Sequence, residues 1–277
     1  MLFRSRRACA LAAVLALAAA LLGFLVMATG AIPIRASSGH WPITEALLTF
    51  ATRRSVATDS LGVEVPPLDD PALVHRGAGH FETGCSPCHG NPDNRSPPIA
   101  GRMAPPPPWL PQSVGSWSDA QLFTIVAHGI KFAGMPAWPA PERADEVWAV
   151  VAFLRVLPTL DAAAYRRLAD GEAAAPGPAA ELEEMAVSID GPRALLATCA
   201  RCHGVAGLGR GVGAFPRLAG QREVYLAASL EAYAAGARPS GIMRPIAAGL
   251  RAGEVLALAR HFASLPPPPP VPIADPA

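Results

Sequence analysis

Two short runs of the chain place cysteine and histidine at one fixed spacing. Cys85-Ser86-Pro87-Cys88-His89 is repeated as Cys199-Ala200-Arg201-Cys202-His203. In such a run the two thiols can each form a thioether with a haem vinyl group, and the adjoining imidazole reaches the iron. Two Cys-x-x-Cys zinc knuckles are the alternative, but a histidine follows both pairs. The sequence therefore predicts two covalently bound haem c groups, attached to Cys85, Cys88, Cys199 and Cys202, with His89 and His203 as iron ligands.

The helices that must position these residues are predicted from apolar periodicity and helix-boundary signals. Asp70-Pro71 pairs an N-cap with a proline at the first helical position, and Asp190-Gly191-Pro192 opens the second domain similarly. In the last helix of each domain, apolar residues recur at i, i+3, i+4 and i+7 before a Leu-Pro pair. No alternating strand pattern of useful length is present. We expect an all-α, duplicated fold, with helices near 72–84, 118–128, 146–157, 192–199, 222–235 and 254–265.

A glycine precedes each cysteine motif at the same distance. Gly77 lies eight positions before Cys85, and Gly191 lies eight before Cys199. An apolar residue follows each glycine by four positions, one helical step away. This pattern indicates a close helix–helix crossing in both domains.

The second axial ligand of each iron is predicted from the repeat at the ends of the domains. Such ligands are usually Met or His in electron carriers. Glu146-Val147-Trp148-Ala149 matches Glu254-Val255-Leu256-Ala257, and in that frame Met135 and Met243 each lie 12 positions before the valine. Met103 competes in the first domain but has no counterpart in the second, and His128 is a weaker alternative. We expect Met135 and Met243 to be the ligands.

Several further residues are assigned either to the surroundings of the haems or to solvent. A proline carbonyl, from Pro97 or Pro98 in the first domain and Pro216 in the second, is expected to accept the N–H of the proximal histidine. Three helical histidines, His75, His80 and His261, are expected to be solvated. The candidates for contact with the haem propionates are Arg102, Trp109, Arg217, Gln221, Tyr225 and Arg238.

The first 30 residues have the composition of an anchor or a signal sequence. Arg4, Arg6 and Arg7 precede an apolar run from Ala8 to Ala28. A run of about 21 residues is long enough to cross a bilayer, while Met27–Ala31 leaves cleavage by a signal peptidase open. The arginines would keep the N-terminus inside and everything after Gly30 outside. We expect a single-pass anchor in a bacterial inner membrane, or a periplasmic protein if the segment is cleaved.

The remaining chain divides by composition and by the two motifs. The net charge of +1 suggests no nucleic-acid partner. Four of the five cysteines belong to the motifs, which leaves only Cys9 and no disulfide framework. A helix capped by Thr44, or a solvated stalk, is expected before the first haem domain. The predicted divisions are 1–30 membrane segment, 31–69 pre-domain segment, 70–160 first domain, 161–185 solvated linker, 186–266 second domain and 267–277 proline-rich tail.

Over about Pro71 to Pro266 the chain resembles the di-haem class I cytochromes c of bacterial respiratory chains. The resemblance rests on both Cys-x-x-Cys-His motifs, on Met135-Pro136, on the C-terminal amphipathic helices and on the run Phe215–Gln221 followed by Tyr225-Leu226. The second domain departs from the pattern in having Arg244 between Met243 and Pro245. The resemblance implies electron transfer between membrane complexes, with redox partners such as a terminal oxidase or a quinol-oxidising complex.

Three functions compete at this point. The first is an electron carrier that is not itself an enzyme. The second is the cytochrome subunit of a periplasmic dehydrogenase or terminal oxidase complex. The third, a di-haem peroxidase, needs one iron with an open position, and the methionine found in frame in both domains disfavours it.

Overall fold

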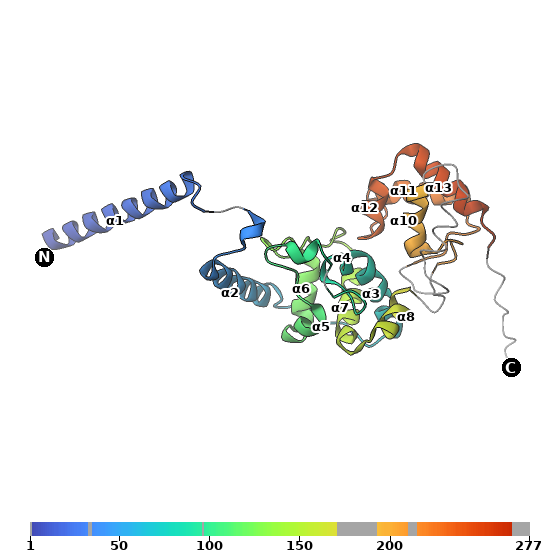
Figure 1. Ribbon diagram of the computed structural model, residues 1–277, viewed down its shortest axis with the longest axis horizontal. Helices are drawn as coiled ribbons and strands as arrows, with labels where there is room; N and C mark the ends of the chain where they lie inside the picture. Colours follow the sequence, from blue (N-terminus) through green and yellow to red (C-terminus); the bar gives the residue numbers. More distant parts are fainter. Residues whose placement is uncertain (1, 33–34, 96, 171–192, 210–214, 268–277) are drawn as a thin grey trace.

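The fold was analysed in a computed structural model that describes residues 2–32, 35–95, 97–170, 193–209 and 215–267. The predicted all-α architecture is confirmed: within these ranges the backbone forms helices, turns and two isolated β-bridges, Asn91 with Asn94 and Ile130 with Met135. Figure 1 shows the order in space, from α1 at the N-terminal end through a central group of helices, α3 to α8, to a second group, α10 to α13.

The bounds of the helices agree closely with the boundary signals in the sequence. Before and within the first domain the α-helices are α1 (Leu2–Ala28), α2 (Pro42–Asp59), α3 (Pro71–Gly84), α4 (Ser86–His89), α5 (Leu110–Ser113), α6 (Asp119–His128), α7 (Ala144–Val156) and α8 (Ala162–Asp170). The second domain contains α10 (Arg193–His203), α11 (Glu223–Ala234), α12 (Met243–Ala248) and α13 (Ala252–Ser264). Short 3₁₀ turns are η1 (Ala36–Ser38), η2 (Ala100–Arg102), η3 (Val114–Ser116) and η4 (Leu157–Thr159).

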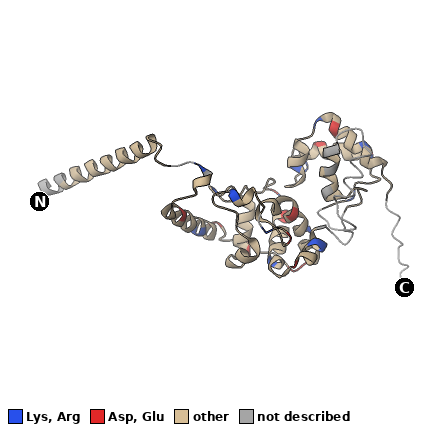
Figure 2. Ribbon diagram, in the orientation of Figure 1, with Lys and Arg blue, Asp and Glu red and all other residues tan. Residues whose placement is uncertain are grey.

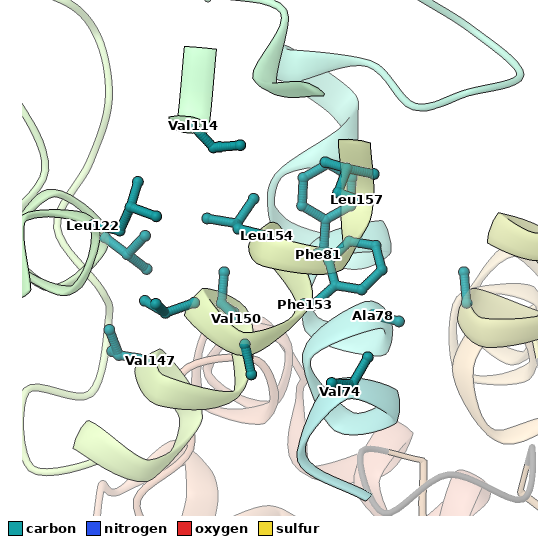
Figure 3. Close-up of a cluster of buried hydrophobic side chains, with 14 of the residues drawn as sticks. Val74, Ala78, Phe81, Val114, Leu122, Val147, Val150, Phe153, Leu154 and Leu157 are labelled. Atoms are coloured by element: carbon teal, nitrogen blue, oxygen red, sulfur yellow. The ribbon is translucent and has the colours of Figure 1, made fainter. Parts of the chain in front are cut away.

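The first domain is built on the crossing of α3 and α7. Gly77 makes this approach possible, because a β-carbon there would lie 1.9 Å from the carbonyl oxygen of Ala149. Phe81 of α3 and Phe153 of α7 are fully buried, with ring centroids 5.1 Å apart. Figure 3 shows both rings among the valines and leucines of this core. The glycine pattern therefore predicted the crossing correctly in this domain, whereas Gly191 lies outside the described residues.

Side-chain caps define where two of these helices begin. The Asp70 carboxylate accepts a hydrogen bond from the Ala72 N–H at 2.9 Å, one position after the predicted proline start. Ser118 and Gln121 form a reciprocal capping box at the start of α6, with distances of 3.2 and 3.0 Å. Each bond satisfies an N–H that the first helical turn leaves without an internal partner.

The second domain has a smaller buried cluster than the first. Leu196 of α10, Leu226 of α11 and Phe262 of α13 form its centre. Gly207, whose φ of +64° is in the left-handed region, lets the loop after α10 pass close to the Phe262 ring. In a domain of this size a covalently held apolar group would supply much of the missing core.

The segment expected to be a linker begins with a helix of the first domain. The sequence places 161–185 in a solvated linker, but α8 packs against α3 and buries Tyr165, which is 2% exposed. Tyr165 lies edge-on to Phe81, with ring centroids 6.2 Å apart, and its hydroxyl donates to the Glu82 carboxylate. The aromatic anchor outweighs the polar composition of this stretch. The later residues of the expected linker, from 171 on, lie outside the described residues.

The helix before the first domain starts earlier than expected. Thr44 was the expected cap, but α2 begins at Pro42 with Trp41 in the N-cap position. Proline is suited to the first helical position because its φ is preset and it has no N–H to satisfy. The C-terminal part of α2 lies on the first domain, where Val56 is buried and the Arg53 guanidinium lies 4.9 Å from the centre of the Trp117 ring.

The N-terminal helix α1 includes one stretch that is long and apolar enough to cross a membrane. Ala8–Ala28 spans 21 residues with a mean hydropathy of 2.7, and none of it is buried against the rest of the chain. Figure 2 shows this stretch without charged residues. By length and composition it qualifies as a membrane span, and a signal sequence near an N-terminus would have the same properties.

Candidate functional site

The first cysteine motif lies at the junction of α3 and α4. Cys85 caps the end of α3, and Cys88 and His89 belong to the single turn of α4. The His89 Nδ1 atom lies 3.0 Å from the carbonyl oxygen of Pro108. The sequence had suggested Pro97 or Pro98 for this acceptor, and Pro108 takes the role because the proline-rich loop folds back over the imidazole. This bond orients the ring and leaves Nε2 for the iron.

The second motif forms the C-terminal end of α10. His203 is 6% exposed, and its Nδ1 atom lies 2.7 Å from the carbonyl oxygen of Pro216. The predicted role of Pro216 is thus confirmed. The two histidines have the same arrangement, with one ring nitrogen held by a proline carbonyl and the other available as a ligand.

Burial sets the protonation of the histidine and of the first thiol in each motif. Burial lowers the pKa of both His89 and His203, so each imidazole is neutral and able to ligate a metal. Burial raises the pKa of the Cys85 thiol to about 12 and that of Cys199 to about 11. A thioether formed by these thiols would carry no charge. Among the described residues, no three His, Cys, Asp or Glu side chains lie close enough to hold a metal ion together.

A cavity of about 310 Å³ adjoins the second motif. His203 and Met243 both line it, together with Cys199 and Cys202. A smaller adjoining cavity is also lined by His203 and Met243, and around it lie Arg217, Gln221, Tyr225 and Arg238. The structure therefore brings the predicted ligands of the second iron to one space, with the predicted propionate contacts beside it.

Part of the larger cavity is lined by the first domain, which the sequence did not reveal. Arg76 and His80 come from α3, and Arg143 and Glu146 come from the start of α7. The sequence contains only a weak signal for these residues: they are charged or polar positions in or next to helices that are mainly apolar. These residues are separated from the second motif by more than 50 positions, so only the fold brings them there.

His80 differs from its prediction, because it is buried and not solvated. It is 6% exposed, and burial lowers its pKa to about 4. Glu146 and Asp145 oppose this shift, while Arg76 and Arg143 add to it. His80 Nε2 and Arg76 Nε are buried nitrogens without a hydrogen-bond partner. A haem carries an apolar macrocycle and two carboxylates, so this cavity, with its thiols, its two predicted iron ligands and the buried nitrogens of Arg76 and His80, fits such a group.

In the first domain both candidate methionines come to the same loop. Met135 is half-buried, and its carbonyl oxygen accepts a hydrogen bond from the Ile130 N–H at 3.1 Å. The side chain of Met103 reaches the neighbouring Gly134, where an added β-carbon would lie 2.5 Å from its Cε atom. His128 is exposed at the end of α6. Met103 is thus a neighbour of the Met135 loop.

The two methionines differ in local structure despite their common sequence frame. Met135 lies in the loop between α6 and α7, whereas Met243 is the first residue of α12. The Met243 N–H donates to the Ser240 hydroxyl at 3.2 Å.

Two known families match the chain, one around each cysteine motif. The family described as cytochrome c oxidase, cbb3-type, subunit III matches residues 72–154, and the cytochrome c family matches residues 188–255. Each match includes one Cys-x-x-Cys-His motif and the helices around it.

Curated relatives carry related names. Proteins named thiosulfate dehydrogenase electron acceptor, from Thiomonas intermedia and Stutzerimonas stutzeri, are 44% and 41% identical over 71 and 70 residues. These matches cover 26% and 25% of this chain and 33% and 32% of the relatives, so the chain spans about a third of their length.

A smaller relative is matched over most of its length. Cytochrome c-554(548) of Halomonas halodenitrificans is 36% identical over 72 residues, which make up 25% of this chain and 86% of that protein. No solved structure matches the chain. With two matching family regions and a relative covered over most of its length, this chain belongs to the c-type cytochromes.

Proposed function

We propose that this protein carries single electrons between redox partners in the periplasm through two covalently bound haem c groups. Cys85 and Cys88 would attach the first, and Cys199 and Cys202 the second. Each iron would have one histidine and one methionine ligand: His89 with Met135, and His203 with Met243.

The observation that carries this proposal is the lining of the second cavity. His203 and Met243 approach the same space, and the thiols of Cys199 and Cys202 border it. An iron held by both of these side chains would have no open coordination position. The same ligation at both irons would favour a carrier over a peroxidase, which needs one open position.

The chain would orient the proposed iron ligands and set the reduction potential of each haem. A bound haem c supplies a reversible one-electron couple. The proline carbonyls at Pro108 and Pro216 hold each imidazole in one orientation, at 3.0 and 2.7 Å. The methionine thioether is a soft ligand, which stabilises the reduced iron and raises the reduction potential.

The relatives support a dehydrogenase as the electron donor. Two of them are named as electron acceptors of thiosulfate dehydrogenase. We propose that this protein takes electrons from a periplasmic dehydrogenase that oxidises a reduced sulfur compound, and passes them to a terminal oxidase. Helix α1 would hold it at the inner membrane if the helix is retained after export.

A second candidate function is supported by the first domain. Residues 72–154 match the subunit III family of cbb3-type oxidases. In that role the protein would be a fixed subunit of the oxidase complex. A stable complex with oxidase subunits after gentle detergent extraction of membranes would favour this function, and a free cytochrome would favour the carrier.

The carrier function is tested by a redox titration of the purified holo-protein, followed at the haem absorption bands. We expect two one-electron steps and a thioether–iron charge-transfer band from both low-spin ferric haems. Thiosulfate together with thiosulfate dehydrogenase should reduce the protein rapidly, while thiosulfate alone should not. High-spin ferric iron together with fast reduction of peroxide would overturn the proposal.

A further inference from the structure

Glu146 is a buried carboxylate at the contact between the two domains. It is 2% exposed and lies in the first turn of α7. Its Oε2 atom accepts two hydrogen bonds, from the Trp138 indole N–H at 3.0 Å and from the Gly241 backbone N–H at 2.8 Å. One oxygen atom therefore joins a side chain of the first domain to the backbone of the second.

Both donors lie next to the predicted methionine ligands. Trp138 follows Met135 by three positions, and Gly241 precedes Met243 by two. The carboxylate thus contacts the segments that carry both methionines, which we call the methionine loops (Met135–Trp138 and Pro239–Met243).

Arg143 adds a second link between the same elements. Its Nη1 atom lies 3.0 Å from Glu146 Oε1 and donates to the carbonyl oxygen of Pro239 at 2.7 Å. The Arg143 and Glu146 pair therefore contacts two backbone groups of the second methionine loop, the Pro239 carbonyl and the Gly241 N–H. Such charge-assisted hydrogen bonds are stronger than neutral ones.

The contact is also tightly packed. A β-carbon at Gly241 would lie 2.4 Å from the Trp138 Nε1 atom, so the loop backbone rests directly on the indole. Ser240 is buried, and the side chain of Ile242 packs against the core of the first domain. In Figure 1 α12, which follows this loop, lies on the side of the second domain that faces the first.

From this geometry we propose that Glu146 is a positioning residue that holds both methionine loops, so that methionine ligation of the second haem depends on the first domain. The inference rests on the proposed ligation by Met135 and Met243. Helix α7 is the rigid element, because its buried face forms the core of the first domain. Trp138 and Ile242 give the loops an apolar contact with the same core, and the carboxylate adds the polar acceptor that joins the two loops through one atom.

Removing the carboxylate tests this role through the stability of the iron–thioether bonds. Imidazole displaces a methionine ligand, and its affinity for ferric haem rises when the methionine loop is loosened. We expect Glu146→Leu to bind imidazole at least tenfold more tightly, equivalent to about 1.4 kcal/mol. Glu146→Gln keeps one acceptor oxygen and should lie between Glu146→Leu and wild type. Asp119→Asn is the control, because Asp119 pairs with Arg155 within the first domain, away from both loops.

The measurement is an imidazole titration of the full-length ferric holo-proteins, with NMR of the ferrous forms to follow the two ring-current-shifted methionine methyl signals. Imidazole affinity within twofold of wild type in both Glu146 variants, with unshifted methyl signals, would overturn the inference. If Glu146→Leu does not fold, the test rests on Glu146→Gln, for which we expect the imidazole affinity to rise at least threefold. Absence of methionine methyl signals in the wild-type protein would refute the proposed ligation itself, which separates the two failures.

Discussion

Replacing Gly77 by alanine would test whether the close approach of α3 to α7 sustains the first domain. The added β-carbon would lie 1.9 Å from the Ala149 carbonyl oxygen and 2.8 Å from the Phe153 Cβ atom. Ordinary contact begins at about 3.4 Å, so the two helices would have to separate by about 1.5 Å. One of these atoms belongs to the backbone and the other is the first carbon of a side chain, so neither can rotate away.

The free energy of unfolding should fall despite a favourable local effect. Glycine to alanine in an open helix interior stabilises by about 1 kcal/mol. Overpacking a core costs about 1–3 kcal/mol and occasionally more, and a separation of this size also loosens the contact between Phe81 and Phe153. No flexible side chain can move aside to relieve the clash, so we expect the overpacking cost to lie at or above the upper end of this range. We expect a net loss of about 2 kcal/mol or more.

Urea unfolding followed by tryptophan fluorescence is the suitable assay. All five tryptophans lie between positions 41 and 148, so the signal reports on the first domain and the segment before it. The matched control is Gly115→Ala in the same domain, because no atom lies within 4 Å of a β-carbon there. If Gly77→Ala were as stable as wild type, or gained as much stability as Gly115→Ala, the crossing would not be the constraint that we describe.

Three further predictions concern pH, ligation and capping. Because burial lowers the pKa of His80 from 6.5 to about 4, the unfolded chain binds a proton that the folded chain does not. Stability is therefore full above about pH 6.5 and falls by up to about 3 kcal/mol as the pH drops to about 4, and urea midpoints for His80→Gln should lose this dependence. Met135→Ala and Met243→Ala should each abolish the thioether–iron charge-transfer band of one haem, while Met103→Leu keeps both; loss of a band in Met103→Leu would move the ligand there. Ser118→Ala should lower the free energy of unfolding by about 1 kcal/mol in the same assay, and an unchanged value would mean that the capping box contributes nothing.

Much of the fold could be predicted because its signals are local. The proline after Asp70, the serine at position 118 and the apolar periodicity near Val147 act within one or two helical turns, and the helices begin and end close to the predicted positions. Predictions that failed had a tertiary cause. Tyr165 turns the start of the expected linker into α8 by packing on Phe81, and the polar residue His80 is buried with its ring against Trp138.

The sequence by itself determined the chemistry of this protein. Attachment of haem c depends on thiols and an imidazole at a spacing set by a single turn, so two copies of one short motif are sufficient to indicate it. The common frame of Met135 and Met243 similarly follows from residue counting alone.

Only the tertiary structure decided what surrounds that chemistry. It selected Pro108 as the acceptor for His89, brought Arg76 and His80 to the cavity of the second domain, and placed Glu146 between the two methionine loops. Each of these contacts joins residues far apart in the chain. These contacts depend on how the helices pack and the loops close, which local sequence patterns do not specify.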